Sequence, residues 1–197
     1  MKAPEMSFIV LAFSSGNVYF FAAVSKNTLT LITFQNMLLD SQKFRSVMSK
    51  FATGVTVVTT RSGDDIHGLT VNAFCSVSLE PMLVLVCIDK TSKAHALLEK
   101  SKNYAVNFLA ADQEDIARRF ATDQLSASER FGGISHRREV TGAPVFDHSL
   151  GFLDCEILSS YPAGDHTIFV GRVLVFGEKD GAPPLLYFKS AYKSLCL

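Results

Sequence analysis

The chain has 197 residues, of which 48% are hydrophobic and 11% aromatic, so it can form one globular domain with a substantial core. Lys plus Arg number 19, as do Asp plus Glu. The formal net charge is zero and no charged block occurs, which disfavours a nucleic-acid partner. The sequence has four cysteines, Cys75, Cys87, Cys155 and Cys196, and none of them form a CxxC pair. This pattern predicts that they are buried thiols in a reducing, cytoplasmic compartment.

Residues 1–39 are apolar and aromatic but show no helical or strand period. Lys2 ahead of the apolar residues 8–13 is a weak version of a signal peptide, offset by Glu5. Polar residues at 14–17 and 25–27 interrupt the run of about 20 apolar residues that a membrane span needs. The remaining alternatives are an extra strand, a membrane-touching segment, or a natural start at Met37 after an over-extended reading frame. We treat residues 1–39 as an N-terminal extension of unclear role and residues 40–197 as the domain.

The first half of that domain alternates one helix with several strands. Asp40 or Ser41 can cap a helix that ends at Gly54. Its apolar positions 44, 47, 48 and 51 share one face, which predicts that this face is buried. Strands are predicted at 55–60, 66–78 and 82–88. The turn residues 61–65 separate the first two strands, and Glu80-Pro81 separates the last two.

The second half continues in the same way. Thr91 or Ser92 caps a predicted helix at 93–100, a strand follows at 104–109, and Asp112 starts a helix through 120. Residues 123–142 predict an irregular segment with a helical turn at 126–131. Segments 151–160 and 167–177 predict a long hairpin around 161–166, and 185–188 a last short strand.

Six or seven strands against three short helices favour a mainly β fold, a closed or nearly closed antiparallel barrel with a few flanking helices. A doubly wound parallel sheet is disfavoured, because the strands follow one another without the helical crossovers that parallel pairing requires.

Several common site motifs are absent from the sequence. It has no GxGxxG, GxxxxGK[ST], HExxH or GxSxG motif. The five histidines are scattered without metal-ligand spacing, so no metal site is predicted.

Two stretches have the chemistry of a ligand site. In residues 68–78 (GLTVNAFCSVS), small and hydroxyl side chains interrupt a strand and let a flat ring approach the backbone amides; an edge strand with solvated polar residues is the alternative. Residues 87–93 (CIDKTSK) lead a strand into a capped helix start, where free amides and lysines suit a phosphate. The alternative there is an ordinary strand-to-helix turn.

The segments FRSVMSKFATG, VTVVTT, GLTVNAFCSVSLEP, LVLVCIDKTSKAH, YAVNFLA, ARRFA, GDHTIFVGRV and PLLYFKSAY occur in this order between residues 41 and 193. Together they resemble the flavin reductase family of split-barrel flavoproteins. The resemblance implies an antiparallel Greek-key, FMN-binding split barrel that forms a homodimer. It implies NADH or NADPH as reductant, FMN or FAD as acceptor, and a role as a stand-alone reductase or as the reductase component of a two-component monooxygenase.

The resemblance also implies site residues. Those lining the isoalloxazine ring and ribityl chain would be Thr70, Val71, Asn72, Ala73, Phe74, Ser76 and Val77. Those holding the lower ribityl and phosphate region would be Cys87, Ile88, Asp89, Lys90, Thr91 and Ser92, with Lys93 and His95 as further candidates for the phosphate.

For the nicotinamide, the resemblance implies contact by His166, and Tyr187 and Phe188 correspond to a segment that packs over this ring. Without the resemblance, His166 would be a solvated turn residue. Two departures from the family pattern occur: Cys75 where many relatives carry Thr or Val, and Lys189-Ser190 where Arg-Gly is commoner.

The predicted function is therefore an NAD(P)H:flavin oxidoreductase that supplies reduced flavin, with a flavin-dependent monooxygenase as a possible partner. A flavin-binding storage or sensor protein of the same fold is the main alternative; it would need the two flavin stretches but not His166, Tyr187 and Phe188. An oxidase acting on a vitamin phosphate would need a further cluster of basic residues, of which only Arg137-Arg138 is present. Arg137, Arg138 and Arg172 leave NADH and NADPH both open.

Overall fold

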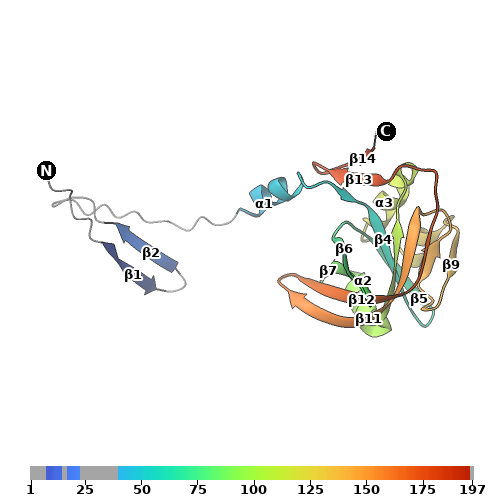
Figure 1. The fold of residues 1–197 in the computed structure, drawn as a ribbon, viewed down its shortest axis with the longest axis horizontal. Helices are drawn as coiled ribbons and strands as arrows, with labels where there is room; N and C mark the ends of the chain where they lie inside the picture. The colour runs from blue at the N-terminus through green and yellow to red at the C-terminus, as the bar shows by residue number, and fades with distance from the viewer. Residues whose placement is uncertain (1–7, 15–16, 23–39, 196–197) are drawn as a thin grey trace. The chain divides into compact units, whose positions relative to one another are not determined.

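The computed structural model describes residues 8–14, 17–22 and 40–195, and the chain divides into two units, residues 1–48 and 49–197 (Figure 1). In the first unit, β1 (Phe8–Ser14) and β2 (Asn17–Ala22) pair antiparallel, so part of the N-terminal extension is strand. The helix α1 (Ser41–Met48) buries none of its side chains. The predicted buried face of this helix is therefore wrong: apolar spacing decides which side chains share a face but supplies no partner for it.

The second unit is built mainly from strands. Its helices are α2 (Lys93–Ser101), the 3-10 turn η1 (Ala111–Gln113), α3 (Glu114–Phe120) and α4 (Ala127–Phe131). Its first strands are β3 (Thr53–Gly54), β4 (Thr56–Ser62), β5 (Asp65–Val71), β6 (Phe74–Leu79), β7 (Met82–Asp89) and β8 (Asn103–Phe108). The later strands are β9 (His136–Arg138), β10 (Pro144–Phe146), β11 (Gly151–Ala163), β12 (His166–Glu178), β13 (Leu185–Phe188) and β14 (Ala191–Ser194).

Seven of these strands form one antiparallel sheet in the order β5-β4-β8-β11-β12-β7-β6. Its two edge strands, β5 and β6, are consecutive in the chain and only Asn72 and Ala73 separate them. The sheet must therefore curl until its edges approach each other. This arrangement confirms the predicted antiparallel split barrel.

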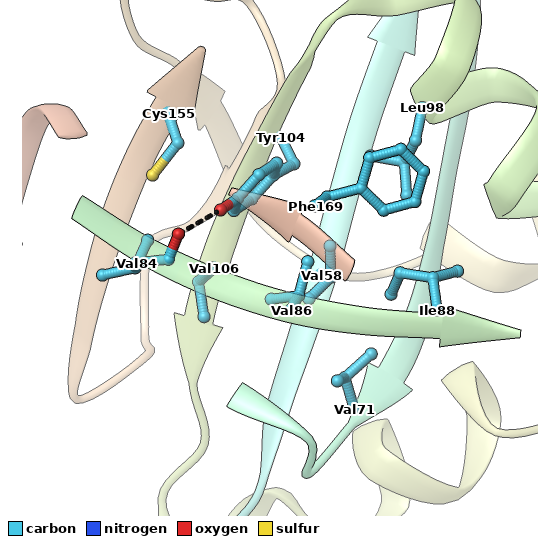
Figure 2. Packing of buried hydrophobic residues seen from close by; sticks show 10 residues of the cluster. All are labelled: Val58, Val71, Val84, Val86, Ile88, Leu98, Tyr104, Val106, Cys155 and Phe169. Carbon is cyan, nitrogen blue, oxygen red and sulfur yellow. Dashed lines mark hydrogen bonds between the residues drawn. The ribbon is translucent and has the colours of Figure 1, made fainter. Parts of the chain in front are cut away.

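The core of the barrel shows the same closure. Strands from opposite halves of the sheet contribute to a single buried cluster: Val58, Val71, Val84, Val86, Ile88, Leu98, Tyr104, Val106, Cys155 and Phe169 (Figure 2). Tyr104 on β8 is fully buried and donates its hydroxyl to the Val84 carbonyl of β7, 3.3 Å away. Burial raises the pKa of Tyr104, so the phenol stays protonated and keeps this donor.

A second apolar cluster lies where α3 and α4 pack against β4 and β5: Val55, Val57, Leu109, Ala117, Phe120, Phe131, Phe146 and Leu185. The buried Arg130 donates to the carbonyls of Phe120 and Thr122 at the end of α3. A side chain thus satisfies carbonyls that a helix end leaves without partners. No helix in the described ranges is long and apolar enough to cross a membrane.

Most of the predicted elements are present, with one difference that matters for the site. The predicted single strand at 66–78 is two strands, β5 and β6, joined by the exposed pair Asn72-Ala73. The hairpin strands β11 and β12 are longer than predicted and leave only Gly164 and Asp165 between them. Gly164 has a φ of 62°, a conformation that glycine adopts without strain.

We expect Gly171→Ala to destabilise the fold. A Cβ on Gly171 would lie 2.6 Å from Cζ of the buried Tyr104, so β12 or the ring must shift, at a cost of about 1 to 3 kcal/mol. Thermal or urea unfolding measures the loss. Gly54→Ala is the matched control, because nothing lies within 4 Å of the added carbon. Equal stability of the two variants would contradict this packing.

Candidate flavin and nicotinamide site

The corner between β5 and β6 presents an open stretch of backbone. Asn72 and Ala73 are exposed, and no hydrogen bond within the described part of the chain uses the Asn72 side chain. The corner is fixed from both sides: Thr70 donates its hydroxyl to the Ala117 carbonyl of α3 at 2.6 Å, and the Phe74 ring contacts Phe108 edge-on at 5.5 Å. A fixed corner with free amide groups suits the edge of a flat, polar ring.

The two stretches predicted to hold flavin meet at this corner. The backbone N–H of Cys87 on β7 donates to the Ala73 carbonyl at 3.0 Å. Along β7 the side chains alternate, with Val84, Val86 and Ile88 buried in the barrel and Leu83, Leu85, Cys87 and Asp89 partly exposed on the other face. Cys87 and Asp89 therefore both lie on the outer face of the sheet, with Cys87 the nearer of the two to the corner.

The end of β7 leads into α2 through a tightly bonded turn. Oδ1 of Asp89 accepts hydrogen bonds from the backbone N–H and the hydroxyl of Thr91, both at 2.7 Å. These hydrogen bonds lower the pKa of Asp89, and the one from the Thr91 hydroxyl has the larger effect. Ser92 caps α2 by accepting from the His95 N–H, as predicted for the helix start. A helix N-terminus of this kind has further amides available for an anion.

The other candidate side chains for the phosphate differ in whether they already have a hydrogen-bond partner. Lys93 is exposed at the first residue of α2. The ring of His95 is already engaged: Nε2 lies 2.8 Å from the Thr167 hydroxyl, and the ring contacts Phe169 edge-on. Lys90 donates its ammonium group to the Gly164 carbonyl at 2.6 Å. Lys93 is thus freer to meet a phosphate than either of the other two side chains.

His166 lies on the outer face next to this turn. It is the first residue of β12 and pairs with Asp89 of β7. Its Nδ1 lies 2.8 Å from Oδ1 of Asp165, and since a carboxylate only accepts, Nδ1 carries the proton. The hydrogen bond from His166 is the largest cause of the lowered pKa of Asp165. Nε2 is left to meet a ligand.

The loop just before His166 is tethered to Lys90, the residue that follows β7. Lys90 donates its backbone N–H to the Asp165 carbonyl at 3.0 Å, in addition to its ammonium bond to Gly164. The histidine is therefore a strand residue with fixed neighbours and not the solvated turn residue that sequence position alone suggests. Sequence reasoning missed Asp165 as its partner, although the adjacency of Asp165 and His166 is the signal for it.

The C-terminal candidates occupy a different neighbourhood. Tyr187 on β13 pairs with Thr53 of β3 and contacts the Tyr192 ring edge-on at 5.5 Å. It packs against the second apolar cluster, which includes Ala117 of α3. Phe188, next to it, is partly exposed. Tyr187 and Thr70 therefore both lie near Ala117 of α3, since Tyr187 packs against the cluster that contains Ala117 and Thr70 is hydrogen-bonded to its carbonyl. No described contact joins Tyr187 to His166.

The remaining predicted residues follow the same geometry. Val71 and Ile88 are buried in the barrel core, so they reach a ligand only through their backbone. Ser76 and Val77 are exposed on β6, where the pairing with β7 is irregular between Ser76 and Ser78. Phe108, which supports Phe74, was not predicted because it comes from a strand 34 residues further along the chain.

Comparisons with known proteins identify the family. Residues 48–196 match the family described as flavin reductase like domain. The chain is 38% identical over 154 residues to an NADH-dependent flavin reductase from Rhodococcus sp, covering 77% of this chain and 84% of that protein. It is 35% identical over 159 residues to the flavin-dependent monooxygenase reductase subunit HsaB of Mycobacterium tuberculosis, covering 80% and 83%.

A solved structure is also similar. The Streptomyces globisporus C-1027 NADH:FAD oxidoreductase SgcE6, in complex with NAD and FAD fragments, matches with a TM-score of 0.75 and 34% identity. The match covers 80% of this chain and 94% of that one.

We expect Asn72→Ala to weaken flavin binding. Loss of one donor from the exposed corner should cost about 1 to 3 kcal/mol of binding free energy. Fluorescence titration with FMN and with FAD measures the change. Gln124→Ala, which removes an exposed amide from the loop between α3 and α4, is the control and should bind as the unmodified protein does. Unchanged affinity in Asn72→Ala would contradict the assignment.

Proposed function

We propose that this chain, which belongs to the flavin reductase-like domain family, is an NADH-dependent flavin reductase that uses FMN or FAD. One observation carries the proposal: β7 brings the flavin corner and the candidate nicotinamide contact onto the same face. On one side of β7, the Cys87 backbone N–H donates a hydrogen bond to the Ala73 carbonyl. On the other side, Asp89, two residues further along, is the strand partner of His166. Donor and acceptor rings bound there would lie next to each other.

The exposed corner and the capped turn fit a flavin nucleotide. The amides and Asn72 side chain of the corner would hold the polar edge of the ring, and the start of α2 with Lys93 would hold the phosphate. When bound, the flavin supplies the acceptor for a hydride from nicotinamide. The task of the chain is then to orient both rings and to exclude water between them.

His166 would orient the nicotinamide carboxamide. Because Asp165 holds Nδ1–H, Nε2 is available as an acceptor for the amide N–H or, when protonated, as a donor to the amide oxygen. A carboxamide offers both groups, so either protonation state of the histidine can bind it. His166 thus positions the substrate without having to transfer a proton.

Two of the three arginines that could recognise a 2′-phosphate are already paired, which favours NADH over NADPH, while Arg138 is exposed. Arg137 is paired with Glu139 at 2.8 Å and Asp147 at 3.0 Å, and Arg172 is paired with Glu156. A guanidinium already paired with carboxylates has less positive potential for a phosphate. The names of two similar proteins also specify NADH.

A flavin storage or sensor protein is the second candidate. It would need the corner and the turn but not a tethered histidine on the same face. The bond between His166 and Asp165 and the two bonds from Lys90 favour the reductase, since a binding protein has no use for a fixed donor-ring contact.

Three further parts of the proposal concern the setting of the chain. A flavin-dependent monooxygenase would accept the reduced flavin, as the name of HsaB specifies for its own system. A cytoplasmic location follows from the need for NADH and flavin nucleotides. The catalytic domain would comprise residues 40–197, supported by the family match over residues 48–196, with residues 1–39 as an extension.

We also propose a homodimer formed through an apolar surface at the β6–β7 hairpin end of the outer sheet face. Its members are exposed large apolar side chains: Val77, Leu79, Met82, Leu158, Leu174 and Phe176. Leu79 is 86% and Phe176 61% exposed. Exposed large apolar side chains gathered on neighbouring strands are typical of a protein–protein interface. A second copy fits it, because a twofold interface pairs one such patch with itself.

The reductase is tested by anaerobic stopped-flow absorbance near 450 nm, in which bleaching of bound flavin by NADH is expected. His166→Ala should raise the apparent KM for NADH about tenfold through the loss of one hydrogen bond, and flavin affinity should stay nearly unchanged. His148→Ala, an exposed histidine elsewhere, is the control. Tight flavin binding without bleaching would indicate the storage protein. If His166→Ala weakened flavin binding as much as it raised the KM for NADH, the assignment of His166 to the nicotinamide would be refuted.

The dimer is tested by sedimentation in the presence of flavin. The unmodified protein should sediment at twice the chain mass of 21.6 kDa, and Leu79→Asp with Phe176→Asp should sediment as a monomer because charges would be buried unpaired. Val140→Asp, at a position 69% exposed on another part of the surface, should leave the dimer intact. A monomeric unmodified protein would contradict the proposal.

A further inference from the structure

Two cysteines lie on the outer face next to the flavin corner. Cys75 on β6 is exposed and Cys87 on β7 is partly exposed, and neither is in a disulfide. Cys75 pairs with Leu85, and Cys87 follows Leu85 by two residues on the same face of the strand. The thiols are therefore diagonal neighbours on adjacent antiparallel strands. The exposure of Cys75 also corrects the prediction that the cysteines are buried.

We propose that Cys75 and Cys87 form a peroxide-oxidisable dithiol site, which closes to a disulfide and thereby weakens flavin binding. The inference rests on the proposed function only for its oxidant, since reduced flavin released into air reduces dioxygen to hydrogen peroxide. The Cys75 thiolate attacks the peroxide, giving a sulfenic acid and hydroxide. The Cys87 thiolate displaces hydroxide from that sulfur. Overall, two thiols and one hydrogen peroxide give one disulfide and two waters.

The order of these steps follows from the surroundings of each sulfur. Burial, and then the neighbouring Cys75, raise the pKa of Cys87. Cys75 is the more exposed thiol and meets the oxidant first. Cys155 is fully buried, and burial raises its pKa to about 12, so it takes no part.

Closing the bond requires a small movement of β6. Diagonal neighbours have Cα atoms about 7 to 8 Å apart, whereas disulfides usually span about 4.4 to 6.8 Å. β6 can move because it is the edge of the sheet and its pairing with β7 is irregular just after Cys75. Ala73 and Phe74 precede Cys75 directly, so the movement displaces the corner that holds the flavin.

The test uses the full-length protein without bound flavin, treated with hydrogen peroxide and then analysed by peptide mass spectrometry and FMN titration. We expect a linked peptide pair of Cys75 and Cys87 that is about 2 Da lighter than the two thiol peptides. We expect FMN affinity about fivefold weaker, the effect of losing one hydrogen bond of average strength. Dithiothreitol should restore both.

Cys75→Ser should bind FMN as the unmodified protein does and should keep that affinity after peroxide. Cys196→Ser should still form the link. The proposal is overturned if Cys75 stays reduced, stops at a sulfinic acid with Cys87 free, or links to another cysteine, or if the linked protein binds FMN normally. None of these outcomes depends on NADH oxidation, so the dithiol site and the proposed reductase can fail separately.

Discussion

The position of β7 between β6 and β12 is the constraint on which the site depends. On one side, β7 pairs with β6, and the Cys87 N–H extends that pairing to the Ala73 carbonyl. On the other side it pairs with β12 from Leu83 to Asp89, which places His166 beside Asp89. Both predicted ligand contacts are therefore set by backbone hydrogen bonds of one strand, and not by flexible side chains. A change in the register of β7 by one residue would turn Cys87 and Asp89 into the barrel.

The barrel core holds β7 in that place. The curvature of the sheet brings β7 over β8, where the Tyr104 hydroxyl bonds to the Val84 carbonyl. Gly171 on β12 leaves the space that the Tyr104 ring fills. The ring thus connects the strand that carries His166, the strand that carries Cys87 and the centre of the core. Packing so close to a glycine tolerates little change in volume, so β7 and β12 share the rigidity of the barrel core.

Local chemistry made much of this predictable from the sequence. Ser92 before an amphipathic run predicts the start of α2, and Gly164-Asp165 predicts the hairpin turn. The sequence does not show where strand 66–78 breaks, because Asn72 is one of several small or polar residues in it; closure of the barrel forces the corner at this position. Asp165 as the partner of His166, Phe108 behind Phe74, and the exposed face of α1 depend likewise on what packs nearby, which periodicity does not contain.

The polar residues around His166 explain how an exposed histidine keeps one orientation. An isolated surface ion pair contributes little, because water and side-chain entropy compete with it. Here the Asp165 backbone is itself held by the Lys90 N–H, and the Lys90 ammonium fixes Gly164. The carboxylate that orients the ring is therefore attached to a loop with two other hydrogen bonds to Lys90, the residue that follows β7. The hydrogen bonds of the loop hold the Asp165 carboxylate in place, and the carboxylate determines which nitrogen of the His166 ring faces the ligand.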